Sequence, residues 1–131
     1  MKIALKDYVV ESLNLKSSLD HSVEDDLKIS FTNGYSDGEP KNFTVMFTIE
    51  LYTAERFYLE VVKTFEFETD ELITDEFKQS PFPVVNAPAI AYPYLRSFIG
   101  TLTLNAGLDA VMLPTVNFQA MYNASKNSGS N

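Results

Sequence analysis

With 131 residues, 45% of them hydrophobic and 21% charged, the chain has the composition of one folded globular domain. Its formal net charge of −8 argues against nucleic acid as a partner, and the absence of cysteine excludes disulfides, thiolate catalysis and cysteine-ligated zinc. The apolar runs are too short to span a membrane and the first residues lack the core of an export signal, so we expect a cytoplasmic protein without membrane insertion.

The first half of the chain alternates apolar and polar residues with the period of two that is typical of β-strands. Four strands are predicted, over residues 3–15, 27–32, 43–51 and 57–67, with loop signals at Asn33-Gly34 and Asp37-Gly38 and a tight turn near Ala54. On the first strand the residues expected to share the apolar face are Ile3, Leu5, Val9, Leu13 and Leu15. Short connections between these strands predict an antiparallel sheet with one apolar face.

The second half changes to helical spacing. Thr69 or Asp70 is suited to cap a short helix that runs to about Lys78. Three prolines then predict an extended crossing segment, because proline fits neither a regular helix interior nor a central strand; these are Pro81, Pro83 and Pro88.

Residues 89–105 have the apolar stripe of a longer helix, formed by Tyr94, Leu95, Phe98, Ile99 and Leu102. Gly107 stands where a left-handed C-terminal cap is expected. An irregular return over 108–115 leads to a brief terminal helix over 116–124, capped by Asn117.

The expected fold class is therefore α+β: a four-stranded antiparallel sheet with a proline-rich crossover and helices packed on one side. One domain is expected over 1–123, followed by a disordered polar tail over 124–131.

A domain of this architecture is expected to have more apolar surface than its own helices can cover. The chain has ten Phe and seven Tyr, and one long helix does not obviously hide the apolar face of four strands. Such a face is either covered by sister subunits or left open to a ligand. For any single aromatic residue, the alternative is that it belongs to the ordinary core of the domain.

No catalytic constellation is present. His21 is the only histidine, no glycine-rich phosphate loop follows a strand, and neighbouring acids such as Asp75 and Glu76 diverge on a helix. The acidic clusters at 24–26 and 66–76 lack calcium-loop spacing, so each is expected to be a solvated face or a docking patch for a basic partner. We therefore expect no enzyme activity, no cofactor and no metal site.

One pair of motifs resembles a known family. Residues 91–98 read Ala-Tyr-Pro-Tyr-Leu-Arg-Ser-Phe, and about twenty residues later 113–118 read Leu-Pro-Thr-Val-Asn-Phe. This pair is similar to the helix start and the Ala-Pro-Val-Asn-Phe segment of the SecB family of protein-export chaperones. The order of strands, crossover and long helix also matches that family along nearly the whole chain.

The resemblance implies an ATP-independent holdase that binds unfolded polypeptides in apolar grooves and delivers preproteins to the ATPase of the Sec translocase. The groove residues it implies are Leu27, Ile29, Phe31, Pro83, Val85 and Pro88. It also implies a homotetramer, a dimer of dimers, with interface residues Leu59, Val61, Tyr94, Phe98 and Leu102.

Translocase docking in the family uses acids near the end of the first strand and a Leu-x-Glu pair. Here the corresponding positions are Ser12 and Lys16, and Tyr58-Leu59-Glu60 keeps Glu60 but not the leucine. These departures favour a divergent SecB-like protein, for which a dedicated chaperone of the antitoxin of a toxin–antitoxin module is the alternative to general export. A binding or assembly protein that reuses the fold without chaperone activity is a further alternative.

Overall fold

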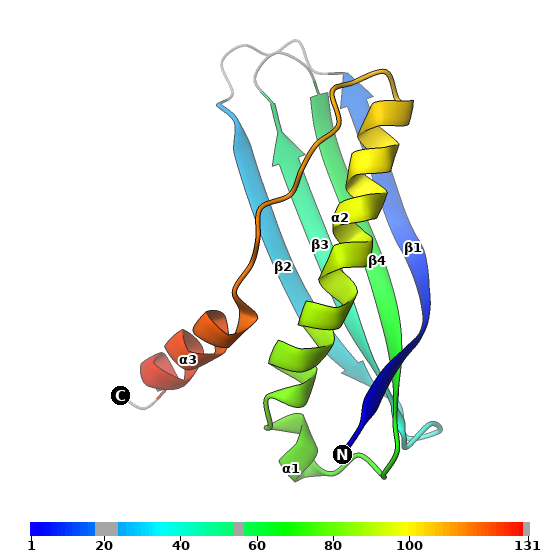
Figure 1. The fold of residues 1–131 in the computed structure, drawn as a ribbon, viewed down its shortest axis with the longest axis vertical. Helices are drawn as coiled ribbons and strands as arrows, with labels where there is room; N and C mark the ends of the chain where they lie inside the picture. The colour runs from blue at the N-terminus through cyan, green and yellow to red at the C-terminus, as the bar shows by residue number, and fades with distance from the viewer. Residues whose placement is uncertain (18–23, 54–56, 130–131) are drawn as a thin grey trace.

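A computed structural model describes residues 1–17, 24–53 and 57–129. The expectations for His21, for the turn near Ala54 and for the last two residues of the tail lie outside these residues. The described chain forms one sheet with helices against one of its faces (Figure 1).

The sheet contains β1 (Ile3–Ser17), β2 (Asp26–Tyr35), β3 (Asn42–Tyr52) and β4 (Phe57–Thr69), all antiparallel. Their order is β1-β4-β3-β2, so β1 and β2 are the edge strands. The predicted four-stranded antiparallel sheet is confirmed.

The face assignment on β1 is wrong at one residue. The register between β1 and β4 shifts between Leu5 and Asp7 and again between Val10 and Ser12. Each shift adds a residue to β1 and reverses the alternation that follows. Tyr8 therefore lies opposite the buried Phe65 on the helix side, whereas Val9 faces away from the helices.

The core lies between α2 and the helix-facing side of the two central strands. On β3 and β4 every second side chain is buried, as the alternation predicts: Phe43, Val45, Phe47, Ile49, Leu51, Phe57, Leu59, Val61, Phe65 and Phe67. Two polar residues of β4 occupy the same buried positions, Thr69 at the end of the strand and Lys63, which is only 4% exposed.

The crossover is helical rather than extended, which corrects the expectation from its prolines. The helix α1 (Asp75–Lys78) begins after Thr74, whose side chain accepts the N–H of Phe77, so neither Thr69 nor Asp70 is the cap. A π-helical turn, η1 (Phe82–Asn86), leads directly into α2 (Ala87–Asn105). The prolines are tolerated because the first turns of a helix have no internal acceptor for their missing N–H groups.

The long helix ends as predicted. Gly107 has φ 86°, and Leu108 N–H donates to Thr103 C=O while Gly107 N–H donates to Leu104 C=O, the bonds of a Schellman cap. The return segment that follows runs back beside α2 (Figure 1). The buried Thr103 hydroxyl fixes it by accepting Val111 N–H at 2.9 Å.

The terminal helix α3 (Phe118–Gly129) is longer than expected. Asn117 caps it, since its side-chain oxygen accepts Ala120 N–H at 2.9 Å. Residues 124–129 are therefore helical, which corrects the predicted disordered tail. In the described part of the chain, no helix is both long and apolar enough to cross a membrane.

Candidate functional site

An apolar groove of about 540 Å³ lies beside the edge strand β2. Its walls come from β2, from the end of α1 with η1, and from α3: Ile29, Ser30, Phe31, Asn33, Lys78, Gln79, Ser80, Val84, Met121, Tyr122 and Ser125. The three walls are far apart in sequence, and the sheet edge brings them together.

Ile29 and Phe31 are in this groove because they alternate on the helix-facing side of an edge strand. They pair with Ile49 and Phe47, which are fully buried, yet both remain partly exposed because no further strand lies beyond β2. An edge strand also leaves one row of backbone N–H and C=O groups available for pairing. The groove thus combines apolar side chains with a free strand edge.

The other predicted groove residues have different positions. Leu27 is partly buried against the core on the same side of β2, outside the lining of the cavity. Pro83 and Pro88 are buried, so the expectation that they form a groove wall is wrong. The helical backbone of η1 and α2 places both side chains toward the core.

Val85, also predicted, is partly buried and packs on the core, while its neighbour Val84 lines the groove. The crossover is fixed against β2 by the Asn33 amide, which donates to Pro83 C=O at 2.8 Å and to Thr44 C=O at 3.3 Å.

The contribution of α3 was not predicted. Phe118 anchors this helix, being only 5% exposed with ring centroids 5.7–6.2 Å from those of Tyr92, Phe31 and Phe47. Met121 and Tyr122 follow at positions three and four residues on, and the Tyr122 hydroxyl donates to Gln79 C=O at 3.5 Å. The spacing of Phe118, Met121 and Tyr122 could have predicted this wall of the groove from the sequence, because it places the three side chains on one face of a helix.

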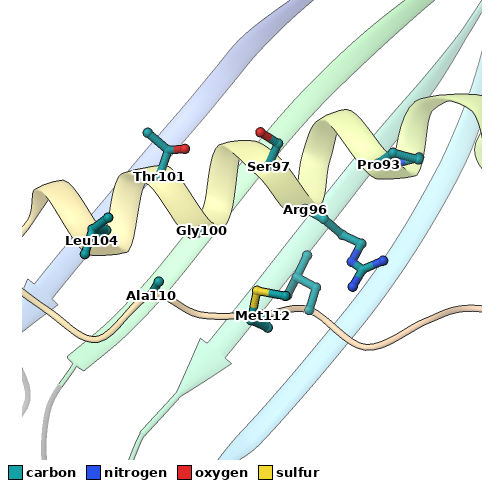
Figure 2. A pocket seen from close by; sticks show the side chains of 9 residues that line it. Pro93, Arg96, Ser97, Gly100, Thr101, Leu104, Ala110 and Met112 are labelled. Atoms are coloured by element: carbon teal, nitrogen blue, oxygen red, sulfur yellow. The ribbon is translucent and has the colours of Figure 1, made fainter.

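A second apolar cavity, of about 430 Å³, lies between α2 and the return segment (Figure 2). Its lining consists of Pro93, Arg96, Ser97, Gly100, Thr101, Leu104, Ala110, Met112 and Leu113. The return segment contacts α2 at Gly100, where a Cβ would lie 3.5 Å from the carbonyl oxygen of Val111, an ordinary van der Waals distance. In Figure 2, Arg96 projects from α2 toward the return segment, which carries Met112, and Ser97 and Thr101 project from the other side of the helix.

The predicted interface residues fall into two groups. Leu59 and Val61 are completely buried inside the subunit, so the expectation that they contact another subunit is wrong. Tyr94 is 48% exposed, while Phe98 and Leu102 are partly buried on the flank of α2. Tyr94 lies beside Tyr8 of β1, with ring centroids 5.8 Å apart.

Glu60 lies on the face of the sheet away from the helices, directly opposite Glu50 of β3. Tyr58 donates its hydroxyl to the Glu60 carboxylate at 2.7 Å, and this bond is the main reason that the pKa of Tyr58 rises to about 12. The Tyr52 ring packs on Tyr58 with centroids 4.5 Å apart. This face therefore carries an acidic and aromatic patch formed by Glu50, Glu60, Tyr52 and Tyr58.

Within the described residues, no group of three or more His, Cys, Asp or Glu side chains is arranged to hold a metal ion.

Comparison with known proteins identifies the class. The family model described as preprotein translocase subunit SecB matches residues 1–129. The chain therefore belongs to the SecB family, whose members are chaperones rather than enzymes, and it is a chaperone.

Sequence relatives agree with this assignment. An uncharacterized protein of Methanocaldococcus jannaschii is 31% identical over 131 residues, covering 92% of this chain and 83% of that protein. The protein-export protein SecB of Afipia carboxidovorans is 26% identical over 123 residues, covering 90% of this chain and 75% of that protein.

Among solved structures, a SecB-like chaperone of Mycobacterium tuberculosis in complex with a ChAD peptide from the HigA1 antitoxin has a TM-score of 0.69 at 14% identity. The match covers 88% of this chain and 91% of that chain. A protein of unknown function from Streptococcus agalactiae has a TM-score of 0.53 at 13% identity, covering 88% and 98%. At these identities the matches show the fold, and they confirm the expected α+β class.

Proposed function

We propose that this chaperone is an ATP-independent holdase that binds non-native polypeptides in the groove beside β2. The observation that carries the proposal is the pair Ile29 and Phe31, which stay partly exposed beside Met121, itself 47% exposed. An exposed apolar strip of this kind is the feature that a site needs in order to bind clients of many different sequences.

The chemistry of the groove explains how such binding works without a specific sequence. Each large apolar side chain of a client that becomes fully buried contributes roughly 1.5–3 kcal/mol, with no demand for directed hydrogen bonds. An extended client backbone can also pair with the free edge of β2, which depends on main-chain groups common to all sequences. Methionine in the wall adds a flexible surface that adapts to different side chains.

We infer two client classes. Preproteins destined for the Sec translocase are the first, and the translocase ATPase is then a partner at the patch around Glu60. The antitoxin of a toxin–antitoxin module is the second, and two observations favour it: the fold is similar to that of a chaperone solved with an antitoxin peptide, and the docking positions carry Ser12, Lys16 and Tyr58.

We also propose that the working assembly is a homotetramer located in the cytoplasm. Its support is the flank of α2 and the neighbouring part of β1, where Tyr8 is 49%, Leu13 is 46% and Tyr94 is 48% exposed. Aromatic and leucine side chains clustered at this exposure are typical of a surface that another subunit covers.

The test is suppression of aggregation. A chemically unfolded polypeptide unrelated to this protein is diluted into buffer with a stoichiometric amount of the chaperone and no nucleotide, and light scattering is followed. Suppression supports general holding. Failure with the unrelated polypeptide, together with binding to a single antitoxin, supports the dedicated role, and failure with both rejects the holdase.

A further inference from the structure

Lys78 gives the groove beside β2 a positive charge. Among the described residues that line the groove, it is the only charged one, and the other polar members are neutral: Ser30, Asn33, Gln79, Ser80, Tyr122 and Ser125. The ammonium nitrogen of Lys78 lies 4.7 Å from the ring centroid of Tyr35, so the ring holds the charge beside the end of β2. In a chain with a net charge of −8, the lining of this groove is therefore a local exception.

Lys126 places a second cation beside the same groove. It follows the lining residue Ser125 on α3, and its ammonium nitrogen lies 5.0 Å from the ring centroid of Tyr122, which also lines the groove. The Tyr122 hydroxyl donates to Gln79 C=O at 3.5 Å, so the two walls that carry the lysines meet. Two ammonium groups thus border one apolar groove, one at the end of α1 and one on α3.

The acidic residues around Lys78 lie outside the groove. Lys78 also borders a smaller pocket of about 130 Å³, whose lining includes Asp37 and Glu39. Neither of these acids lines the groove, and neither do Asp75 and Glu76 of the helix that carries Lys78. A carboxylate that enters the groove therefore meets a lysine in its wall and no acidic side chain.

The place of Lys78 along β2 determines where such a carboxylate belongs. Ile29, Phe31 and Tyr35 share the helix-facing side of β2, because their partners on β3 are buried. A client strand that pairs with the free edge of β2 has the same alternation, so its side chains two residues apart also face the helices together. When two apolar client side chains pack on Ile29 and Phe31, the next helix-facing positions toward Tyr35 lie beside Lys78.

We propose that the groove prefers client segments in which an aspartate or glutamate stands two to four residues from an apolar pair on the same face, and that Lys78 determines this preference. The inference rests on the holdase function proposed above and adds a client class to it. The carboxylate pairs with the Lys78 ammonium, and Lys126 adds attraction from the second wall. A client lysine at the same position meets a like charge, so the groove distinguishes clients that are equally apolar.

The test crosses two peptides with three proteins and reads binding by fluorescence anisotropy. One labelled serine-based peptide has leucine and phenylalanine two residues apart and a glutamate two residues beyond each, so that either strand direction presents an acid. The second peptide has glutamine in place of both glutamates.

Each peptide is titrated with the parent protein, with Lys78→Gln and with Lys28→Gln. Lys28→Gln is the matched control, because Lys28 is an exposed lysine of β2 that pairs with Glu50 and faces away from the groove. Both lysines are exposed, so the variants are expected to fold, and circular dichroism checks this.

We expect the parent to bind the glutamate peptide about threefold more tightly than the glutamine peptide, as for one partly exposed ion pair. The preference should shrink as the salt concentration rises. Lys78→Gln should lose the preference, and Lys28→Gln should keep it. Equal affinities of the parent for the two peptides, or an undiminished preference in Lys78→Gln, would overturn the role of Lys78.

The client preference and the holding activity fail separately. Equal binding of both peptides removes the preference and leaves the holdase in place. A parent that binds neither peptide yet suppresses client aggregation overturns this inference alone, and one that does neither overturns both proposals.

Discussion

Replacement of Ile29 by aspartate is the most informative single change in the groove. Ile29 is partly buried in the free protein, so a client covers only the remaining part of its side chain. Loss of that contact costs about 1 kcal/mol of binding free energy, half of the value for a fully buried isoleucine. Covering the new carboxylate costs at least as much again, so we expect a total near 2 kcal/mol, or roughly 30-fold weaker binding.

The control stands on the same strand. Thr32→Asp introduces the same charge on β2 at an exposed position that pairs with Met46 and faces away from the groove. Ser12→Asp on β1 is a second control, at the opposite edge of the sheet.

Fluorescence anisotropy with a labelled unfolded client measures the affinities of the parent and of the three variants, after urea unfolding has verified that each variant is folded. Weaker binding by Ile29→Asp alone supports the groove. Equal affinities of Ile29→Asp, both controls and the parent would refute the reasoning and remove Ile29 from the client site.

Three further predictions concern the scaffold. Phe118→Ala removes the anchor of α3 and should lower the free energy of unfolding by about 3 kcal/mol, seen as a lower urea midpoint; an unchanged midpoint contradicts the anchoring role. Thr103→Val leaves Val111 N–H without its acceptor and should cost about 1–3 kcal/mol, whereas a neutral result would show that water replaces the hydroxyl. Tyr58 should titrate at about pH 12 by tyrosinate absorbance, and Glu60→Gln should move the pKa of Tyr58 toward 10. In the parent protein, the stability contributed by the hydrogen bond from Tyr58 to Glu60 should fall between pH 10 and 12, because Tyr58 loses its proton at a lower pH in the unfolded chain than in the folded one.

The sheet and its core could be predicted because apolar alternation reports directly on burial. The alternation on β3 and β4 identified the buried side chains of both strands. On β1 it failed at Val9, because register shifts at Lys6 and Glu11 are set by pairing with β4 and have no local sequence signal. The extended backbone predicted for Pro83 and Pro88 was wrong, because the first turns of consecutive helices also accept proline.

The candidate site was predicted only in part, for a different physical reason. The residues of β2 follow from the pattern of one strand, but the groove also needs α3, whose Met121 and Tyr122 arrive through the anchoring of Phe118. Leu59 and Val61 were expected at an interface but are buried inside the subunit. The sequence pattern of an apolar strand face is the same whether that face packs against a helix of the same subunit or against another chain. Only the position of α2 across β3 and β4 decides between them.

The most direct test of the account is the refolding of a tryptophan-containing client in the presence of this chaperone without nucleotide. The chaperone has no tryptophan, so the tryptophan fluorescence reports on the client alone. The account predicts that a stoichiometric amount holds the client at its unfolded emission spectrum, and that Ile29→Asp releases it. Refolding at the same rate and to the same extent with and without the parent chaperone would contradict it.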